Sequence, residues 1–201
     1  MSPAGNLRER IAAVVIGASA GGIEALSVLL PALPAALKVA VFIVLHLPRE
    51  RPSLLAGIFG ERCILPVREA EDKEPVLPGT VYFAPPDYHL LLEPGPSLAL
   101  SIDDLVHYSR PSIDVLFQSA AEVYGASLLG IILTGANEDG AAGLRSVQDA
   151  GGVTIVQDPA TAFEARMVHA ALGRCQPDFV LPIDEIASLL RALEESPCRT
   201  P

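Results

Sequence analysis

The sequence predicts one α/β domain of the doubly wound, three-layer αβα type, in which helices cover both faces of a mainly parallel sheet. Short apolar runs of strand length alternate with segments whose apolar residues recur at helical spacing, as in parallel strands joined by helical crossovers. The chain has 201 residues, of which 50% are hydrophobic and 19% charged, and this suits one folded domain with a sizeable core. We expect that domain at residues 11–193, between an N-terminal tail at 1–10 and a C-terminal tail at 194–201.

Strand and helix signals alternate through the first part of the chain. A predicted strand at Ile11–Ile16 leads into a helix with Leu26 and Leu30 on its apolar face, which Pro34 helps to end. The signals that follow are an apolar run of strand length at Val41–Leu45, a helix opened by Pro52 and Ser53, and a third strand at Ile64–Arg68.

The middle of the chain departs from this alternation. Three short apolar runs, at Thr80–Ala84, Tyr88–Glu93 and Leu98–Ser101, are separated by Pro-Pro-Asp and by Glu-Pro-Gly-Pro. Proline and glycine at these places favour tight turns and leave no length for a helix. We therefore predict hairpin strands, inserted antiparallel beside the main sheet.

The second half returns to alternation. Ser112 is placed to cap a helix that starts at Ile113, and Asp184 is placed to cap a last helix that runs to Leu193. The predicted elements between them are strands at Leu128–Leu133, Val153–Val156 and Phe179–Leu181 and helices at Ala141–Ala150 and Glu164–Leu172.

Charge and composition exclude several classes of protein. The net charge is −10 and the isoelectric point about 4.8, which argues against nucleic acid as a partner because a nucleic-acid binder needs a basic surface. No apolar run reaches the length that spans a bilayer, and the polar start MSPAGNLRER lacks the apolar region of a signal peptide. We therefore expect a cytoplasmic protein that is not inserted in a membrane.

The cysteines and the cofactor motifs give no sign of a bound group. Cys63, Cys175 and Cys198 are far apart and odd in number, so that they fit neither a disulfide framework nor a CxxC metal site. The chain has no HExxH, no P-loop and no GxGxxG. The sequence thus predicts no cofactor and no metal, and favours structural thiols.

The turn after the first strand has the pattern of a nucleophilic serine. Gly17-Ala18-Ser19-Ala20-Gly21 follows a buried-looking apolar run and precedes an apolar-periodic helix, which is the strand–turn–helix context of a Gly-x-Ser-x-Gly nucleophile. The glycines let the chain turn sharply, and the free amides of the helix start face the same space. A phosphate cradle and plain packing are the alternatives for such a turn.

Two further residues lie at the ends of predicted parallel strands. His46 follows Val41–Leu45, and Asp139 lies in the loop after Leu128–Leu133. Because the carboxyl ends of parallel strands meet at one edge of a sheet, Ser19, His46 and Asp139 are expected to project from the same edge. A nucleophile, a base and a carboxylate that orients the base are the set that acyl hydrolysis needs.

Each of these three residues also has a plainer interpretation, which stays open at this point. Ser19 suits a helix cap, His46 a histidine satisfied at a strand end, and Asp139 a cap of the helix at Ala141. Other candidates are less well placed: Asp158 in an apparent turn, His89 in the hairpin, His107 in a polar loop and His169 inside a predicted helix.

Five motifs together resemble the catalytic domain of the chemotaxis protein-glutamate methylesterases, the CheB family. They occur in family order over residues 11–193: Gly17–Gly22, Leu45–Pro48, Arg110–Phe117, Leu133–Leu144 and Gln157–Ala162. The order of the reacting residues is serine, histidine, aspartate, whereas α/β-hydrolases have serine, acid, histidine. The resemblance therefore favours the methylesterases over that larger fold.

The resemblance implies a definite reaction and a role for each residue. Family members hydrolyse γ-glutamyl methyl esters on chemoreceptors with release of methanol, and many also deamidate glutamines there. Carried over, Ser19 is the nucleophile, His46 the general base and later acid, and Asp139 the acid that orients the histidine. The oxyanion donors are expected to be the backbone N–H groups of Ala20 and Ala136.

The resemblance also suggests partners and a further contact. Arg110 lies in a family motif and is expected either to contact substrate or to form a structural salt bridge. The expected partner is a methylated chemoreceptor or a similar signalling protein. Only about ten residues precede the first strand, so we expect no receiver domain in this chain. The alternatives are an enzyme that acts on its own and one that is controlled by a separate receiver or kinase partner.

The chain departs from the family pattern at a few places. Ala20 replaces a common threonine after the serine, Ala136-Asn137 replace a common Met-Gly pair, and Val168 replaces the proline of a usual Met-Pro pair. Asn137 is expected to keep the loop shape because asparagine tolerates positive φ. These changes concern receptor specificity more than the three reacting residues.

Two other classes of function stay open from the sequence. One is a non-catalytic regulatory module that keeps the fold and binds a receptor or a signalling kinase; the intact Ser19, His46 and Asp139 speak against it. The other is a nucleotide-binding doubly wound domain, which the lack of GxGxxG disfavours.

Overall fold

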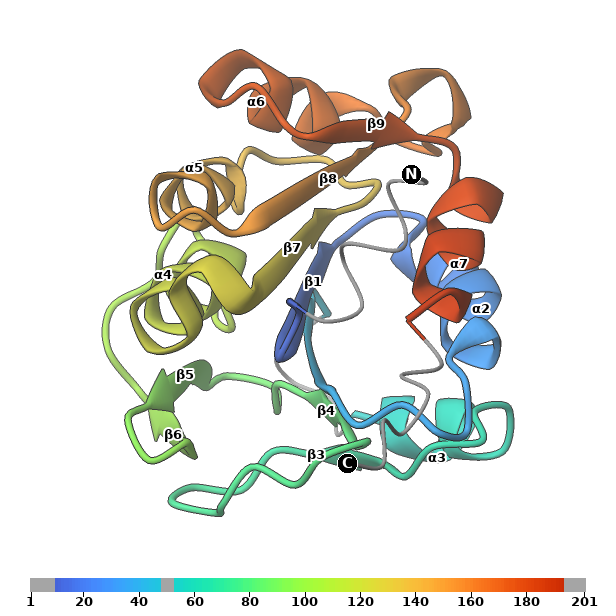
Figure 1. The fold of residues 1–201 in the computed structure, drawn as a ribbon. Helices are drawn as coiled ribbons and strands as arrows, with labels where there is room; N and C mark the ends of the chain where they lie inside the picture. Colours follow the sequence, from blue (N-terminus) through green and yellow to red (C-terminus); the bar gives the residue numbers. More distant parts are fainter. Residues whose placement is uncertain (1–9, 48–52, 194–201) are drawn as a thin grey trace.

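A computed structural model describes residues 10–47 and 53–193. The predicted C-terminal tail at 194–201, all but the last residue of the predicted tail at 1–10, and Pro52 lie outside the described residues. The described part is the doubly wound three-layer αβα fold that the sequence predicts (Figure 1).

The centre of the fold is a seven-stranded sheet in which every neighbouring pair is parallel. Its order is β3-β4-β2-β1-β7-β8-β9, so the chain builds outward from β1 first toward β2 and later toward β7. The strands are β1 (Ala13–Ala18), β2 (Ala40–Leu45), β3 (Val67–Glu69), β4 (Val81–Phe83), β7 (Leu128–Ile132), β8 (Val153–Gln157) and β9 (Phe179–Leu181).

Helices cover both faces of this sheet (Figure 1). One face carries α2 (Gly22–Leu29), α3 (Leu55–Gly60) and α7 (Ile183–Arg191), and the other α4 (Ile113–Tyr124), α5 (Ala141–Asp149) and α6 (Arg166–Arg174). Three short 3₁₀ turns, at Leu30–Ala32, Gly125–Ser127 and Pro159–Thr161, complete the described elements.

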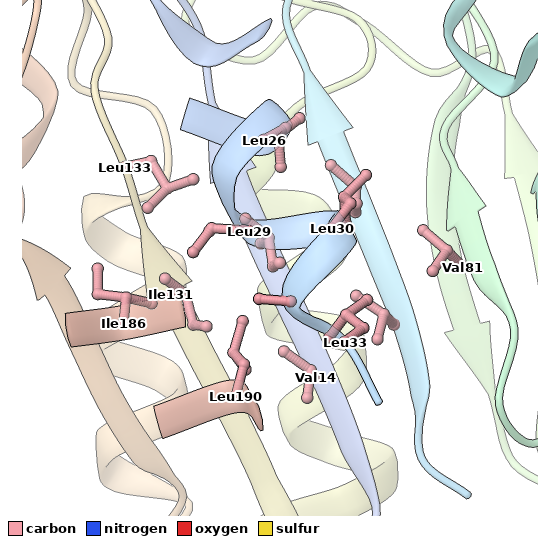
Figure 2. Packing of buried hydrophobic residues seen from close by; sticks show 14 of the residues in the cluster. Val14, Leu26, Leu29, Leu30, Leu33, Val81, Ile131, Leu133, Ile186 and Leu190 are labelled. Atoms are coloured by element: carbon pink, nitrogen blue, oxygen red, sulfur yellow. The ribbon is translucent and has the colours of Figure 1, made fainter. Parts of the chain in front are cut away.

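Alternate residues of the central strands supply two separate cores. Val14 and Ile16 of β1 belong to the core under α2 and α7, whereas Ala13 and Val15 belong to the core under α4 and α5. Figure 2 shows the first of these, in which leucines of α2 and the following 3₁₀ turn meet Ile186 and Leu190 of α7 above the sheet. Burial on both faces explains why these strands are continuous apolar runs.

The antiparallel hairpin predicted in the middle of the chain is confirmed. β5 (His89–Glu93) and β6 (Ser97–Ser101) pair with each other in a separate two-stranded sheet. The hairpin lies beside α4, where the Leu92 N–H donates to Ser119 Oγ at 3.1 Å. It therefore adds to the α4 side of the molecule without extending the central sheet.

Two predictions about elements are wrong. The run at Thr80–Ala84 is not a hairpin strand, because β4 pairs in parallel with both β2 and β3 inside the central sheet. Val81–Phe83 is buried at all three positions, as expected of a strand covered on both faces. Asp184 does not cap the last helix: α7 begins at Ile183 after Pro182, and Asp184 lies in its first turn.

The other predicted elements are confirmed with shifted ends. β1 runs two residues further than predicted because its pairing with β2 continues to Ala18. The third strand is limited to Val67–Glu69, and Ile64, which was predicted to start it, is 70% exposed. Ser112 caps α4 as predicted, and its side chain accepts from the Val115 N–H.

The helix lengths and the cysteines can be compared with what the composition predicts. No helix among residues 10–47 and 53–193 combines the length and the apolar character that crossing a bilayer requires. Cys63 and Cys175 are buried and unpaired, and burial raises the pKa of both thiols; Cys198 lies outside the described residues.

Candidate active site

The three predicted reacting residues follow the carboxyl ends of three adjacent central strands. The last paired residues of β1 and β2 are Ala18 and Leu45, so Ser19 and His46 come next on neighbouring strands. On the other side of β1, Gly17 pairs with Ile132 of β7, whose loop carries Asp139. The strand order reverses at β1, since the early strands lie on one side of it and the later strands on the other. Open α/β sheets bind their ligands at such a point.

The turn at Ser19 is held by backbone bonds on both sides. The Ser19 N–H donates to the Thr134 carbonyl at 3.0 Å, and the Gly22 N–H donates back to the Ser19 carbonyl at 2.8 Å. The sharp turn itself is made at Gly21, which has a φ of 79°, where glycine avoids the steric cost that a Cβ would bring. Ser19 is half-buried and has no left-handed backbone, unlike the strained serine of a hydrolase elbow.

Asp139 is fully buried and accepts four hydrogen bonds. Oδ2 accepts from His46 Nε2 at 2.9 Å and from the Ile113 N–H at 2.7 Å. Oδ1 accepts from the Ser112 hydroxyl at 2.8 Å and from the Asp114 N–H at 3.0 Å. The carboxylate thus lies on the N-terminus of α4, where backbone amides and the helix dipole favour negative charge.

These contacts set the charge of Asp139. Burial on its own would raise the pKa of this carboxyl, but the hydrogen bonds from His46 and from the Asp114 and Ile113 amides hold the pKa below its ordinary value of 3.8. Asp139 is therefore ionised at neutral pH. The interpretation of Asp139 as a cap of the helix at Ala141 is wrong, because the helix that it caps is α4.

The ionised Asp139 fixes the tautomer of His46. A carboxylate only accepts, so Nε2 of His46 carries the hydrogen and Nδ1 is left with its lone pair. Nδ1 faces the Asn137 amide nitrogen at 3.5 Å, and among the described residues no hydrogen bond joins it to Ser19. Such bonds are often long in a protein without substrate.

The loop after β7 approaches Ser19 closely because it begins with glycine. A Cβ on Gly135 would lie 2.6 Å from the Met167 thioether and 3.0 Å from Ser19 Cβ. The absence of a side chain at Gly135 therefore lets the loop pass close to the serine, just before Ala136. The N–H groups of Ala20 and Ala136, which were predicted as oxyanion donors, donate to no acceptor among the described residues.

Asn137 does not hold the loop as expected. It has no positive φ, and Gly140 supplies the left-handed residue of the loop, with a φ of 97°. Instead Asn137 Oδ1 accepts from the Asp139 N–H at 3.3 Å, while its amide nitrogen faces His46. The side chain, rather than the backbone conformation, thus shapes this part of the loop.

A second buried carboxylate, Asp114, binds the N-terminus of α5 in the same way as Asp139 binds that of α4. Asp114, in the first turn of α4, accepts from the Gly140 and Gly143 N–H groups at the start of α5, at 3.0 and 2.6 Å. The N-terminus of α4 therefore binds the carboxylate that precedes α5, and the N-terminus of α5 binds a carboxylate of α4. Burial and the nearby charge of Asp139 raise the pKa of Asp114.

His107 was predicted in an unremarkable polar loop, but it lies beside this pair. Its Nε2 is 3.2 Å from Asp114 Oδ2, and its Nδ1 is 3.4 Å from Glu138 Oε1. His107, Asp114 and Asp139 each place a ligand-type atom within 4.8 Å of the others. The hydrogen bonds of both aspartates are already made within the protein, so the cluster is explained without an ion.

His89 is a structural residue of the hairpin. Its Nδ1 accepts from the Ser112 N–H at 3.1 Å, so its Nε2 carries the hydrogen that meets the Asp104 carbonyl at 3.0 Å. Asp158, the rival acid, accepts from the Ala160 N–H in a turn, as expected. Neither residue contributes to the arrangement around Ser19.

Arg110 is engaged within the protein. Its Nε and Nη2 donate to Asp87 Oδ1 at 3.1 and 2.8 Å, and its Nη1 donates to the Ile102 and Asp103 carbonyls at 2.7 and 3.0 Å. Of the two expectations for Arg110, the geometry supports the structural salt bridge. A substrate contact by this side chain stays a prediction.

Two cavities are lined by neighbours of the serine, although Ser19 lines neither of them. One of about 70 Å³ is lined by His46, Leu47 and Tyr108–Pro111. The other, of about 200 Å³, is lined by residues that include Gly21, Thr134 and Phe163. Both are smaller than the pockets that enclose a drug-sized ligand, so the site suits a small group presented by a larger molecule.

Comparisons with known proteins show the family to which the chain belongs. A family model described as CheB methylesterase matches residues 14–190. A putative protein-glutamate methylesterase/protein-glutamine glutaminase of Leptospira interrogans is 45% identical over 184 residues, covering 92% of this chain and 95% of that protein. A protein-glutamate methylesterase/protein-glutamine glutaminase of Geobacter metallireducens is 43% identical over 177 residues, and the chain spans about half of its length (50%).

A solved structure matches the same fold. The crystal structure of the Thermotoga maritima CheB methylesterase catalytic domain superposes with a TM-score of 0.87 at 35% identity, covering 91% of this chain and 98% of that domain.

Proposed function

The chain belongs to the CheB methylesterase family, and on this premise we propose that it hydrolyses γ-glutamyl methyl esters of a signalling protein with Ser19 as nucleophile. The single observation that carries the serine mechanism is the ionised, fully buried Asp139 in hydrogen bond with His46, one strand away from Ser19. This pair supplies an oriented base where the Gly-x-Ser-x-Gly turn supplies a nucleophile.

The proposed reaction proceeds in two halves. Ser19 Oγ attacks the ester carbonyl while Nδ1 of His46 takes its proton, and the Ala20 and Ala136 N–H groups receive the oxyanion. His46 then gives the proton to the departing methoxide, and methanol leaves a glutamyl ester on Ser19. Water attacks this ester with His46 again as base, which releases glutamate and restores the serine hydroxyl.

The same centre supports a second, related reaction. Hydrolysis of a glutamine side-chain amide follows the same steps, with ammonia leaving in place of methanol. The names of the Leptospira and Geobacter relatives include a glutaminase, and we include deamidation in the proposal on that ground. The methylated partner, a chemoreceptor or a similar protein, and the cytoplasmic location stay predictions of the sequence.

The test compares wild type with Ser19→Ala on a methylated cytoplasmic fragment of a chemoreceptor, with methanol release as the readout. Loss of the nucleophile is expected to lower the rate by roughly 10⁴-fold or more. Ser188→Ala is the matched control, because the Ser188 hydroxyl donates to the Asp184 carbonyl within α7 and lies away from the site. Equal release by wild type and Ser19→Ala would contradict the serine mechanism.

A fluorophosphonate probe separates catalysis from a binding module of the same fold. We expect covalent labelling of wild type and no labelling of Ser19→Ala. His46→Gln should label far more slowly, because the serine then lacks its base. A wild type that stays unlabelled and releases no methanol would instead support a non-catalytic regulatory role.

A further inference from the structure

We propose that Tyr108 and Phe163, one on each side of Ser19, form the contact surface for the protein that carries the ester, and so determine which proteins are substrates. This inference rests on the proposed function. It names a substrate-binding role for two residues outside the Ser19–His46–Asp139 set.

Both aromatic side chains are exposed to an unusual degree. Tyr108 is 92% exposed and Phe163 is 82% exposed. Exposing a large aromatic ring forfeits the free energy that its burial would give. An exposed aromatic pair at a recessed polar centre is typical of surfaces that another protein covers.

Each side chain stands at the rim of one of the two cavities. Tyr108 lines the smaller cavity together with His46. Phe163 lines the larger cavity and lies over the serine turn, since a Cβ on Gly21 would come within 2.5 Å of Phe163 Cβ. A protein segment that presents an ester carbonyl at Ser19 and extends over both cavities would therefore lie over both rings.

The backbone at Tyr108 has a left-handed conformation, which costs free energy for a residue other than glycine. Val106 and Ser109 exchange two backbone hydrogen bonds around His107 and Tyr108, and both central residues have positive φ, 49° and 60°. Such turns strongly favour Asn-Gly, whose residues adopt this conformation readily. His107 is accounted for by its contacts with Asp114 and Glu138, whereas Tyr108 turns most of its surface to solvent.

The turn holds Tyr108 in a fixed place. Its neighbour His107 is bonded to α4 and to the loop that carries Asp139, and Arg110 binds the carbonyls of Ile102 and Asp103. A rigid aromatic contact loses little entropy on binding. The backbone that carries Tyr108 is thus held in place from both sides.

The spacing of the two cavities indicates the kind of partner. They lie along the sheet edge from β2 to β8, with β1 and β7 between, which is about 14 Å at the usual strand separation. A helix covers that length in about two to three turns. The partner that fits is a protein segment with an esterified glutamate and apolar side chains on both sides of it.

The test uses the full chain and two substrates of different size. One is a methylated chemoreceptor cytoplasmic fragment, and the other is N-acetylglutamate γ-methyl ester, which has no protein segment to cover the two rings. For Tyr108→Asn and Phe163→Ala, we expect kcat/KM on the protein substrate to fall roughly tenfold each, mainly through KM. Hydrolysis of the small ester should stay within about twofold of wild type.

Two controls keep the result interpretable. Asparagine tolerates positive φ better than tyrosine, so Tyr108→Asn should keep or raise the melting temperature and cannot act by unfolding the protein. Ile64→Asn removes another large apolar side chain, 70% exposed, that lines neither cavity and should leave both activities unchanged.

The outcomes separate the inference from the proposed function. A wild type that hydrolyses neither substrate contradicts the proposed function itself. Variants that keep wild-type activity on the protein substrate, or that lose both activities in parallel, overturn the inference alone. A wild type that hydrolyses only the small ester contradicts the partner class and therefore overturns the inference too.

Discussion

At the scale of single residues, the central fact is a carboxylate kept charged inside the protein. Asp139 is fully buried, yet hydrogen bonds from His46, Ser112 and two amides of α4 outweigh the cost of burial. The charge orients His46 through the hydrogen bond to its Nε2. The chemistry proposed for Ser19 depends on this one residue remaining ionised.

The lowered pKa of Asp139 predicts an acid-sensitive contribution to stability. Since the folded pKa lies below the unfolded value of 3.8, the stabilisation is fully present above that value and is lost as the pH falls through the folded pKa. We expect Asp139→Asn to remove this contribution. Urea unfolding of both proteins from pH 6 to pH 2.5 measures it.

The expected result is a difference in unfolding free energy that is largest at neutral pH and shrinks toward the acid end. Asp158→Asn is the control, because Asp158 caps an exposed turn. A constant difference between wild type and Asp139→Asn over the whole range would contradict the assigned pKa shift.

The sequence predicts part of this residue-level arrangement. Ser19, His46 and Asp139 follow strands, and the rule for parallel sheets is enough to expect them at one edge. The roles of His107, Asp114 and Asn137 were not predictable in this way, because they depend on how loops fold back. His107 meets Asp114 only through a two-residue turn with positive φ, for which the sequence Val-His-Tyr-Ser gives no signal.

At the scale of elements, α4 and α5 are joined by two aspartates, each of which binds the N-terminus of the opposite helix. Asp139 precedes α5 and binds the N-terminus of α4, while Asp114 belongs to α4 and binds the N-terminus of α5. Amides that would otherwise lack partners at both helix starts are satisfied. The position of Asp139 is thus fixed by the packing of two helices rather than by its loop.

Asp114 tests this arrangement without touching the reacting residues. Asp114→Ala leaves the Gly140 and Gly143 amides buried and unpaired, and should cost about 2–3 kcal/mol of unfolding free energy. Asp114→Asn keeps an acceptor oxygen and removes a charge whose burial is unfavourable, so it should cost less than about 1 kcal/mol. Urea unfolding at pH 7 ranks the two variants.

Activity should follow the same order, because the turn at Gly140 carries Asp139. We expect Asp114→Ala to lower kcat on N-acetylglutamate γ-methyl ester more than Asp114→Asn does. If alanine and asparagine were equally harmful to stability and to rate, the contact with His107 would be the important one instead.

The elements themselves were predictable where their pattern was local. β9 was predicted at its observed ends, and the hairpin of β5 and β6 was read from its proline and glycine residues. β4 was not, because its short apolar run does not reveal whether one or both of its faces are covered. Asp184 was misassigned because Pro182, with its fixed φ, takes the cap position of α7 two residues earlier.

At the scale of the whole molecule, the two cores lie on opposite faces of one continuous sheet. Cys63 belongs to the core under α2 and α3, and Cys175 to the core under α4 to α6. The two thiols are therefore natural reporters for the two layers. If the domain unfolds as a unit, both should become reactive together.

Thiol labelling of Cys198→Ser tests this expectation. In the native protein neither remaining thiol should react rapidly with a disulfide reagent, since both are buried and their pKa values are raised. In increasing urea both should become reactive at one midpoint, which also matches the loss of helical circular dichroism. Reaction of Cys175 at lower urea than Cys63 would show that the α4–α6 layer opens alone.

The hairpin of β5 and β6 gives the chain a natural place to be divided. Its turn, Pro94–Pro96, is exposed and lies outside the central sheet. Residues 1–95 carry Ser19 and His46, while residues 96–201 carry Asp139 and α4, so neither piece holds a working centre. Fused to two interacting proteins, the pieces would regain esterase activity only when their partners bring them together, and the enzyme would become a reporter of association.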